Sequence, residues 1–241
     1  MNDKEEIYKA AVQNVRELSK ALNLIKRLIN TSMRRNKEEE IRALTKVYAS
    51  TYSTWLESCL SKIIHTMDGF CDDEILQIKR ESNIEGKWEK TVELTFRKFN
   101  RTKRGNEVPN KIQQIHRLID KYIISPSLIR NKVMHGQWEV ALNRENTKVN
   151  AQLSQEIQNL SAVEVYKWHF ISFRIIKIIE DLIKSNPQKD NWAHYKDYHV
   201  LLQEITDFEK KSTNWNETSK TKKLERKNPK TPLAPKESKV N

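Results

Sequence analysis

The sequence predicts an all-α protein, a multi-helix bundle, on three observations. Only four glycines and six prolines occur among 241 residues, whereas the hairpins and βα junctions of sheet-containing folds depend on these residues for their turns. Apolar residues recur every three or four positions along most of the chain, which is the period of an amphipathic helix. No internal repeat is found that would indicate a solenoid.

The first predicted elements are two long helices. Residues 5–30 carry one apolar face over about seven turns, formed by Ile7, Ala11, Val15, Leu18, Leu22, Ile25 and Ile29. A second run of the same period extends from Ile41 to Ile63 and ends near Gly69. Each helix is long enough to form an antiparallel pair with the other.

The middle of the chain is less regular. A short acidic-then-apolar segment at 71–78 precedes a helix around Trp88, Val92 and Phe96, and a basic loop follows at 101–110. Pro109 suits the first turn of the next helix, which continues towards Pro126. A short helix then starts with Ser125 or Ser127 as its cap and ends at Gly136.

The last third of the chain contains two further predicted helices. In residues 138–150, apolar and polar side chains alternate imperfectly, and polar turn residues lie at the centre. This pattern is compatible with a small β-hairpin. Residues 161–185 are apolar on more than one face, so this helix requires burial on both, either at the centre of the bundle or at a subunit interface. A final amphipathic helix occupies about 188–210.

The domain organisation follows from a change in composition at Ser212. The preceding residues, 1–211, are expected to form a single helical domain. The segment 212–241 contains three of the six prolines, eight Lys and Arg residues, three Glu residues and almost no aliphatic side chains. Because such a segment cannot bury enough apolar area to offset its conformational entropy, it is predicted to be a disordered basic tail.

Charge and cysteine content narrow the class of protein. The formal net charge is +12, which indicates affinity for polyanions such as nucleic acids. Charged residues interrupt every apolar stretch, so no membrane span is expected, and the N-terminus lacks the layout of a signal peptide. Cys59 and Cys71 form no disulfide framework and no zinc-binding spacing. A cytoplasmic protein without a bound metal is expected.

The segment at 127–138 reads SLIRNKVMHGQW and combines residues suited to RNA chemistry. Arg130 is followed by Asn131, four residues separate Arg130 from His135, and Gly136 follows directly. This arrangement resembles the R-x4–6-H signature of the HEPN superfamily of ribonucleases, all-helical domains common in bacterial toxin–antitoxin, abortive-infection and CRISPR-associated systems. The resemblance covers about residues 36–210 and implies a HEPN-like core.

The residue types themselves suit metal-free RNA cleavage, which needs a proton acceptor, a proton donor and a cation for the charge on phosphorus. His135 lies at a helix C-terminus, where the macrodipole favours the imidazolium form and a role as general acid. Asn131 lies four positions earlier on the same face. Arg130 provides a planar fork for phosphate, although it projects about 140° around the helix from His135.

The resemblance implies a metal-independent endoribonuclease that needs no cofactor and acts as a homodimer, with two motifs in one composite cleft. It also implies a 2′,3′-cyclic phosphate product and a separate antitoxin or sensor protein. Two alternatives stay open: a catalytically inactive HEPN-like module that binds RNA or a protein partner, and a purely structural bundle. In the structural interpretation, His135 caps its helix and Arg130 pairs with an acid such as Glu139.

Several further residues are candidates for RNA contact. The basic side chains nearest the motif and in the middle loop are expected to meet phosphate, namely Lys132, Arg97, Arg101, Lys103 and Arg104. Solvated lysines and charged helix faces explain these residues equally well. Trp138 either packs or stacks on a base. The remaining histidines considered show no ligand spacing and are expected to be ordinary helix residues, namely His116, His169, His194 and His199.

Overall fold

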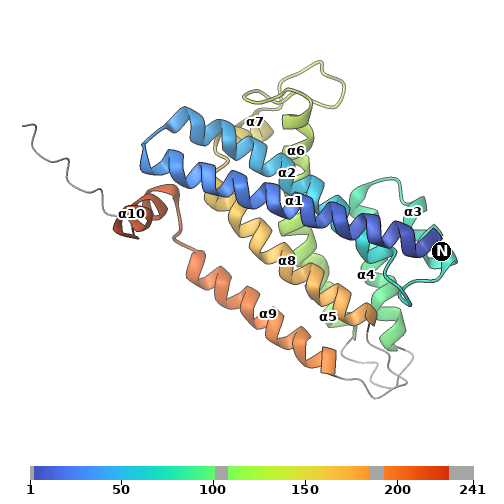
Figure 1. Ribbon diagram of the computed structural model, residues 1–241. Coiled ribbons are helices and arrows are strands. Elements are labelled where there is room, and N and C mark those ends of the chain that lie inside the picture. The colour runs from blue at the N-terminus through green and yellow to red at the C-terminus, as the bar shows by residue number, and fades with distance from the viewer. Residues whose placement is uncertain (1–2, 101–107, 185–192, 228–241) are drawn as a thin grey trace, which may run out of the picture.

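Two long antiparallel helices, α1 (Asp3–Arg34) and α2 (Glu38–Ile64), lie side by side along the molecule (Figure 1). The computed structural model describes residues 3–100, 108–184 and 193–227. A tight turn joins the pair, in which Asn36 adopts a positive φ of 53° and the Lys37 N–H donates to Ser32 O at 3.0 Å. The indole of Trp55 donates to Ser19 Oγ at 3.0 Å and joins the two helices. Both predicted helices are therefore confirmed.

The middle segment forms α3 (Asp72–Arg80), α4 (Ile84–Asn100) and a continuous helical stretch. That stretch consists of α5 (Val108–Ile119), a π-helical turn η1 (Asp120–Ile124) and α6 (Ser125–Met134). The predicted interruption at Pro126 is wrong, because the helix continues through the proline. Pro126 has no N–H to donate to the preceding turn, and Tyr122 O in that turn accepts instead from Tyr52 OH. Neither predicted serine caps α6, and Ser127 Oγ instead donates to Ile123 O at 2.8 Å.

Helix α8 (Ala162–Lys184) occupies the centre of the bundle. It packs against α2, α4, α5, η1 and against α9 (Ala193–Ser212), so its two apolar faces are covered by the chain itself. A buried hydroxyl junction fixes this arrangement, since Tyr52 OH lies 2.6 Å from Ser172 Oγ and donates to Tyr122 O at 2.5 Å. The double apolar face of α8 thus needs no partner subunit.

The predicted β-hairpin is reduced to a single bridge. Within the described residues, Leu142 and Val149 form one isolated antiparallel bridge and no strand is assigned. The segment between them is a turn, and α7 (Ala151–Gln158) follows directly, with the Asn150 side chain accepting from the Leu153 N–H at 3.0 Å. Polar turn residues dominate this segment, so too few residues alternate to extend a ladder.

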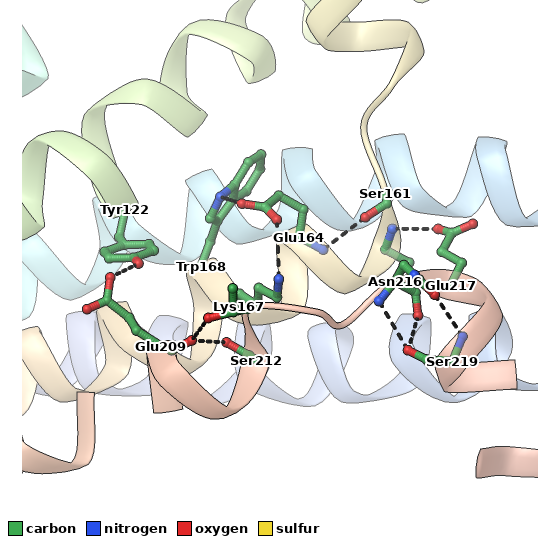
Figure 2. Close-up of polar contacts among 12 residues, drawn as sticks. Tyr122, Ser161, Glu164, Lys167, Trp168, Glu209, Ser212, Asn216, Glu217 and Ser219 are labelled. Atoms are coloured by element: carbon green, nitrogen blue, oxygen red, sulfur yellow. Dashed lines mark hydrogen bonds and ion pairs between the residues drawn. The ribbon is translucent and has the colours of Figure 1, made fainter. Parts of the chain in front are cut away.

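The prediction of a disordered tail from residue 212 is wrong as far as Lys227. Helix α10 (Glu217–Lys227) packs against α1 and α8. Figure 2 shows how it begins: the Ser219 N–H donates to Asn216 Oδ1 at 2.8 Å, and the Asn216 N–H donates to Ser219 Oγ at 3.1 Å. Glu217 Oε1 also accepts from the Ala162 N–H at 2.9 Å. The local capping residues and the contact of Leu224 with the core outweigh the polar composition. Residues 228–241 lie outside the described residues.

Two further predictions concern the start of the last amphipathic helix and the absence of a membrane span. Helix α9 begins at Ala193 in the described part of the chain, and the predicted start near 188 lies outside it. Among the described helices, none combines the length and the apolar character that crossing a membrane requires.

Candidate functional site

A polar cleft of about 880 Å³ opens beside the C-terminal end of α6. Its walls come from α6, from the turn that follows, and from the first residues of α7. The lining residues are Leu128, Asn131, Lys132, His135, Gln137, Leu142, Asn143, Arg144, Asn146, Asn150 and Leu153. Five of them belong to the segment 127–138 that the sequence singles out, namely Leu128, Asn131, Lys132, His135 and Gln137.

His135 is placed by the way in which α6 ends. It is the C-cap residue, and its N–H donates to Asn131 O at 3.2 Å. Gly136 follows with a φ of 77°, a left-handed conformation that favours glycine. The Gly136 N–H donates to Val133 O at 3.1 Å and the Gln137 N–H to Lys132 O at 2.9 Å, which is the Schellman pattern. The predicted helix end is confirmed, and the exposed imidazole lines the cleft.

Asn131 lies one turn before His135 on the same face and also lines the cleft. Its side-chain oxygen accepts a hydrogen bond from Arg130 Nη1 at 3.1 Å. This hydrogen bond fixes the orientation of the Asn131 amide. Asn131 and His135 therefore present an amide and an imidazole to the same polar space.

Arg130 does not line this cleft. Its guanidinium forms an ion pair with Glu57 of α2, its side chain is 21% exposed, and its Nε is buried without a hydrogen-bond partner. Burial lowers the pKa of Arg130 from its ordinary value. The sequence interpretation that paired Arg130 with Glu139 names the wrong acid, because Glu139 instead pairs with Lys46. Within one subunit, the structure brings Asn131 and His135 together and leaves Arg130 outside.

Lys132 builds the cleft wall. Its ammonium donates to Leu142 O at 2.6 Å and lies 3.5 Å from Asn143 O, so it anchors the following turn to α6. This use of the ammonium competes with the expected phosphate contact. The Trp138 indole donates to Val133 O at 3.0 Å, Lys46 Nζ lies 5.6 Å from its ring centroid, and 40% of the residue stays exposed.

The turn at 143–148 holds its shape through side chains. Asn143 Oδ1 accepts from the Thr147 N–H at 2.8 Å and from the Lys148 N–H at 3.2 Å. Gln137 Oε1 accepts from the Leu142 N–H at 2.8 Å. This turn carries an exposed cation into the cleft, Arg144, which the sequence interpretation missed. The available signal was its position within the predicted hairpin directly after the motif.

The other predicted RNA contacts lie elsewhere. Arg97 pairs with Glu93 on α4 at 2.6 Å and is not a lining residue of the cleft. Arg101, Lys103 and Arg104 lie outside the described residues.

The other histidines are embedded in ordinary helix packing where the structure describes them. His169 lies with its ring centroid 4.8 Å from that of Trp55 and 6.1 Å from that of Tyr52, and burial lowers its pKa to about 4. His116 is partly buried on α5, and His199 is exposed beside Tyr198 on α9. The side chain of His194 lies outside the described residues. His116, His169 and His199 do not line the cleft.

Cysteines and carboxylates do not contribute to the cleft either. Cys59 is buried, which raises the pKa of its thiol, and Cys71 is exposed; both are free. Among the described residues, one group has metal-ligand spacing, the exposed carboxylates of Glu85, Glu89 and Asp120, with oxygens within 4.8 Å of one another. No member of this group lines the cleft.

Large apolar side chains are exposed along the segment 128–149, which also supplies most of the lining of the cleft. Met134 is 61% exposed and Val149 is 62% exposed, and three further apolar residues of the same segment, Leu128, Trp138 and Val140, are also exposed. Gathering of exposed apolar side chains is typical of a protein–protein contact surface. We refer to these five residues as the apolar rim.

No protein-family model, curated protein or solved structure matches the chain.

Proposed function

We propose that the chain is a metal-independent endoribonuclease of HEPN type that acts as a homodimer in a bacterial toxin–antitoxin or phage-defence setting. The observation that supports the proposal best is the position of His135, an exposed imidazole at the end of α6 that shares a polar cleft with Asn131. No described residue forms a hydrogen bond with this ring, so it is free to exchange a proton with a substrate.

The proposed reaction forms a bond from the RNA 2′ oxygen to phosphorus and breaks the bond from phosphorus to the 5′ oxygen. The 2′-OH proton goes to a base, and the leaving 5′ oxygen takes a proton from an acid. His135 provides the acid, because its exposed imidazole lines the cleft and a ring nitrogen can donate a proton to the leaving oxygen. Asn131 donates its amide to a phosphate oxygen, and Arg144 supplies positive charge from the facing turn.

One imidazole cannot give and take a proton at the same moment, so a second copy of His135 completes the site. The apolar rim supports a homodimer, because its exposed side chains belong to 128–149, the segment that also supplies most of the lining of the cleft. In this arrangement, the Arg130 guanidinium of either subunit leaves Glu57 to reach phosphate, while Asn131 and His135 stay in the cleft. RNA is the substrate, and an antitoxin or sensor is a separate protein.

The test uses purified protein and end-labelled single-stranded RNA at neutral pH with EDTA present. Cleavage is expected to continue in EDTA and to leave a 2′,3′-cyclic phosphate and a 5′-OH end, because no metal-activated water takes part. Cleavage that EDTA abolishes, or products with a 5′-phosphate, would overturn the proposed mechanism.

A second candidate function is favoured by one observation, the ion pair of Arg130 with Glu57, which keeps the guanidinium out of the cleft. In that case the chain is an inactive HEPN-like module that binds RNA or a protein partner. It predicts RNA binding that weakens steeply with salt and no cleavage in the same assay.

A further inference from the structure

A second pocket of about 390 Å³ lies between α1, α8, α10 and the link that joins α9 to α10. It shares no lining residue with the cleft at His135. Three lysines and two aromatic rings dominate its walls, together with one amide from α1, and these six residues are Lys26, Lys220, Lys223, Tyr166, Trp215 and Asn30. We call this site the lysine–aromatic pocket.

The lysines of this pocket gather around the aromatic rings rather than around acids. Lys26 Nζ and Lys220 Nζ lie 5.6 and 5.7 Å from the centroid of Tyr166. Lys223 Nζ lies 5.6 Å from the ring centroid of Trp215. None of the three ammonium groups forms an ion pair with a described residue. The pocket therefore concentrates positive charge that an anion would neutralise.

Lys220 is the most constrained of these cations. Burial lowers its pKa and the nearby charge of Lys26 lowers it further, while Glu217 acts in the opposite direction. Glu217 is itself engaged by the Ala162 N–H at the start of α8 (Figure 2). A bound anion would restore the stability of the ammonium form of Lys220.

The aromatic rings suit a planar ligand that can stack on them, and the Asn30 amide suits a ligand that carries a hydrogen-bond donor. Tyr166 and Trp215 lie with ring centroids 6.4 Å apart and planes inclined by 23°, and Trp215 is 39% exposed, so part of the indole is accessible to a stacking ring. Asn30 Oδ1 is buried and has no hydrogen-bond partner among the described residues. A buried acceptor of this kind is satisfied by a donor from a ligand.

We propose that the lysine–aromatic pocket binds a nucleotide. The base stacks on Trp215 and Tyr166, the phosphates contact Lys26, Lys220 and Lys223, and a donor of the nucleoside meets Asn30 Oδ1. The volume falls within the range of about 300–1,000 Å³ that small-molecule sites occupy. A simple inorganic anion would leave the rings and the amide unused, and an uncharged aromatic ligand would leave the lysines unneutralised.

This site is independent of the proposed ribonuclease. Five of its six principal residues lie outside the residues 36–210 on which the resemblance to HEPN proteins rests, namely Lys26, Asn30, Trp215, Lys220 and Lys223. Failure of RNA cleavage therefore says nothing about nucleotide binding, and the reverse also holds.

The experiment is isothermal titration calorimetry of the full chain with ADP, and with adenosine and inorganic pyrophosphate as its two parts. ADP is expected to bind at least ten-fold more tightly than either part, because only the whole nucleotide engages both the rings and the lysines. Lys220→Met and Trp215→Leu are each expected to weaken ADP binding at least ten-fold. Lys222→Met, an exposed neighbour outside the pocket, is the matched control and is expected to change the affinity less than two-fold.

Circular dichroism of each variant establishes that it folds, and Lys223→Met, at an exposed position, replaces Lys220→Met if the latter does not. Equal binding of pyrophosphate and ADP would overturn the proposal by showing an anion site only. Equal effects of Lys220→Met and Lys222→Met would overturn it by showing general attraction to the basic surface. A single-stranded oligonucleotide that binds more tightly than ADP, with the same loss in Lys220→Met, would overturn it in favour of RNA.

Discussion

The guanidinium of Arg130 is paired with the carboxylate of Glu57 on α2 and does not line the cleft that His135 lines. The two motif residues are therefore separated within one subunit, although five positions apart in the sequence. The ion pair joins α6 to α2, and in the proposed ribonuclease it also withholds a cation from RNA. Glu57 is 50% exposed, so the pair is weak enough to be exchanged for a phosphate contact.

Replacing Glu57 with Gln releases Arg130. The free energy of unfolding is expected to fall by about 0.5 kcal/mol, as for other exposed ion pairs. RNA affinity is expected to rise about two-fold, because the guanidinium no longer has to leave an acid first. Urea denaturation and filter binding measure the two effects. Glu156→Gln, which changes the charge equally on α7, is the control, and an affinity gain of the same size in this variant would contradict the explanation.

Lys132→Met removes the contact that anchors the turn to α6. Because Lys132 donates to two backbone carbonyls, at Leu142 and Asn143, the free energy of unfolding is expected to fall by about 1.5 kcal/mol, as for a hydrogen bond from a charged group. Urea denaturation provides the measurement. Lys148→Met, an exposed change in the same turn, is expected to have almost no effect. Equal loss in both variants would show that Lys132 does not anchor the turn.

The helical framework could be predicted from periodicity because long amphipathic faces dominate it. The steps of three and four residues along 5–30 and 41–63 correspond to α1 and α2, whose buried faces include Leu22, Ile29 and Tyr52. The end of α6 was also predictable, since Gly136 adopts the positive φ that the Schellman pattern requires.

What could not be predicted depends on partners distant in sequence. The pairing of Arg130 with Glu57 joins α6 to α2 across the fold, and no local pattern identifies which acid a given arginine meets. Helix α10 was missed because average composition hides local signals: the reciprocal bonds of Asn216 and Ser219 and the contact of Leu224 with the core. Arg144 enters the cleft only because the turn at 143–148 folds back towards α6.

Met134→Glu is expected to disrupt the proposed homodimer. Met134 belongs to the apolar rim and is 61% exposed, so a carboxylate there places charge into an apolar contact without disturbing the core. Sedimentation equilibrium is expected to show a shift from dimer to monomer, with RNA cleavage lowered in parallel. Phe173→Glu changes a similarly exposed apolar residue on α8 and serves as the control. A shift from dimer to monomer of equal size in this control would refute the assignment of the apolar rim to the dimer contact.

Stability is expected to fall as the pH is lowered from about 6.5 to 4. His169 has a pKa of about 4 in the folded protein against 6.5 as its ordinary value. Between these values the unfolded state binds more protons, so the contribution is present above pH 6.5 and is lost towards pH 4, amounting to up to about 3 kcal/mol. Burial also lowers the pKa of His65, which adds to the same slope.

The measurement for this prediction is urea denaturation at several pH values between 4.5 and 7, an approximate range that avoids most carboxylate titration. His169→Gln is expected to flatten the pH dependence of the unfolding free energy. His199→Gln, at an exposed histidine, is expected to leave the dependence unchanged. If the free energy of unfolding of His169→Gln depends on pH as steeply as that of the natural chain, His169 is not the origin of the pH dependence.

The central claim is that the imidazole of His135 takes part in RNA cleavage. The most direct measurement compares the cleavage rate of single-stranded RNA in EDTA for the natural chain, His135→Ala and His199→Ala, a control at an exposed histidine on α9. His135→Ala is expected to slow cleavage by about 100-fold or more, as loss of a general acid does, whereas His199→Ala stays within two-fold of the natural rate. Equal rates for the natural chain and His135→Ala would contradict the proposed function.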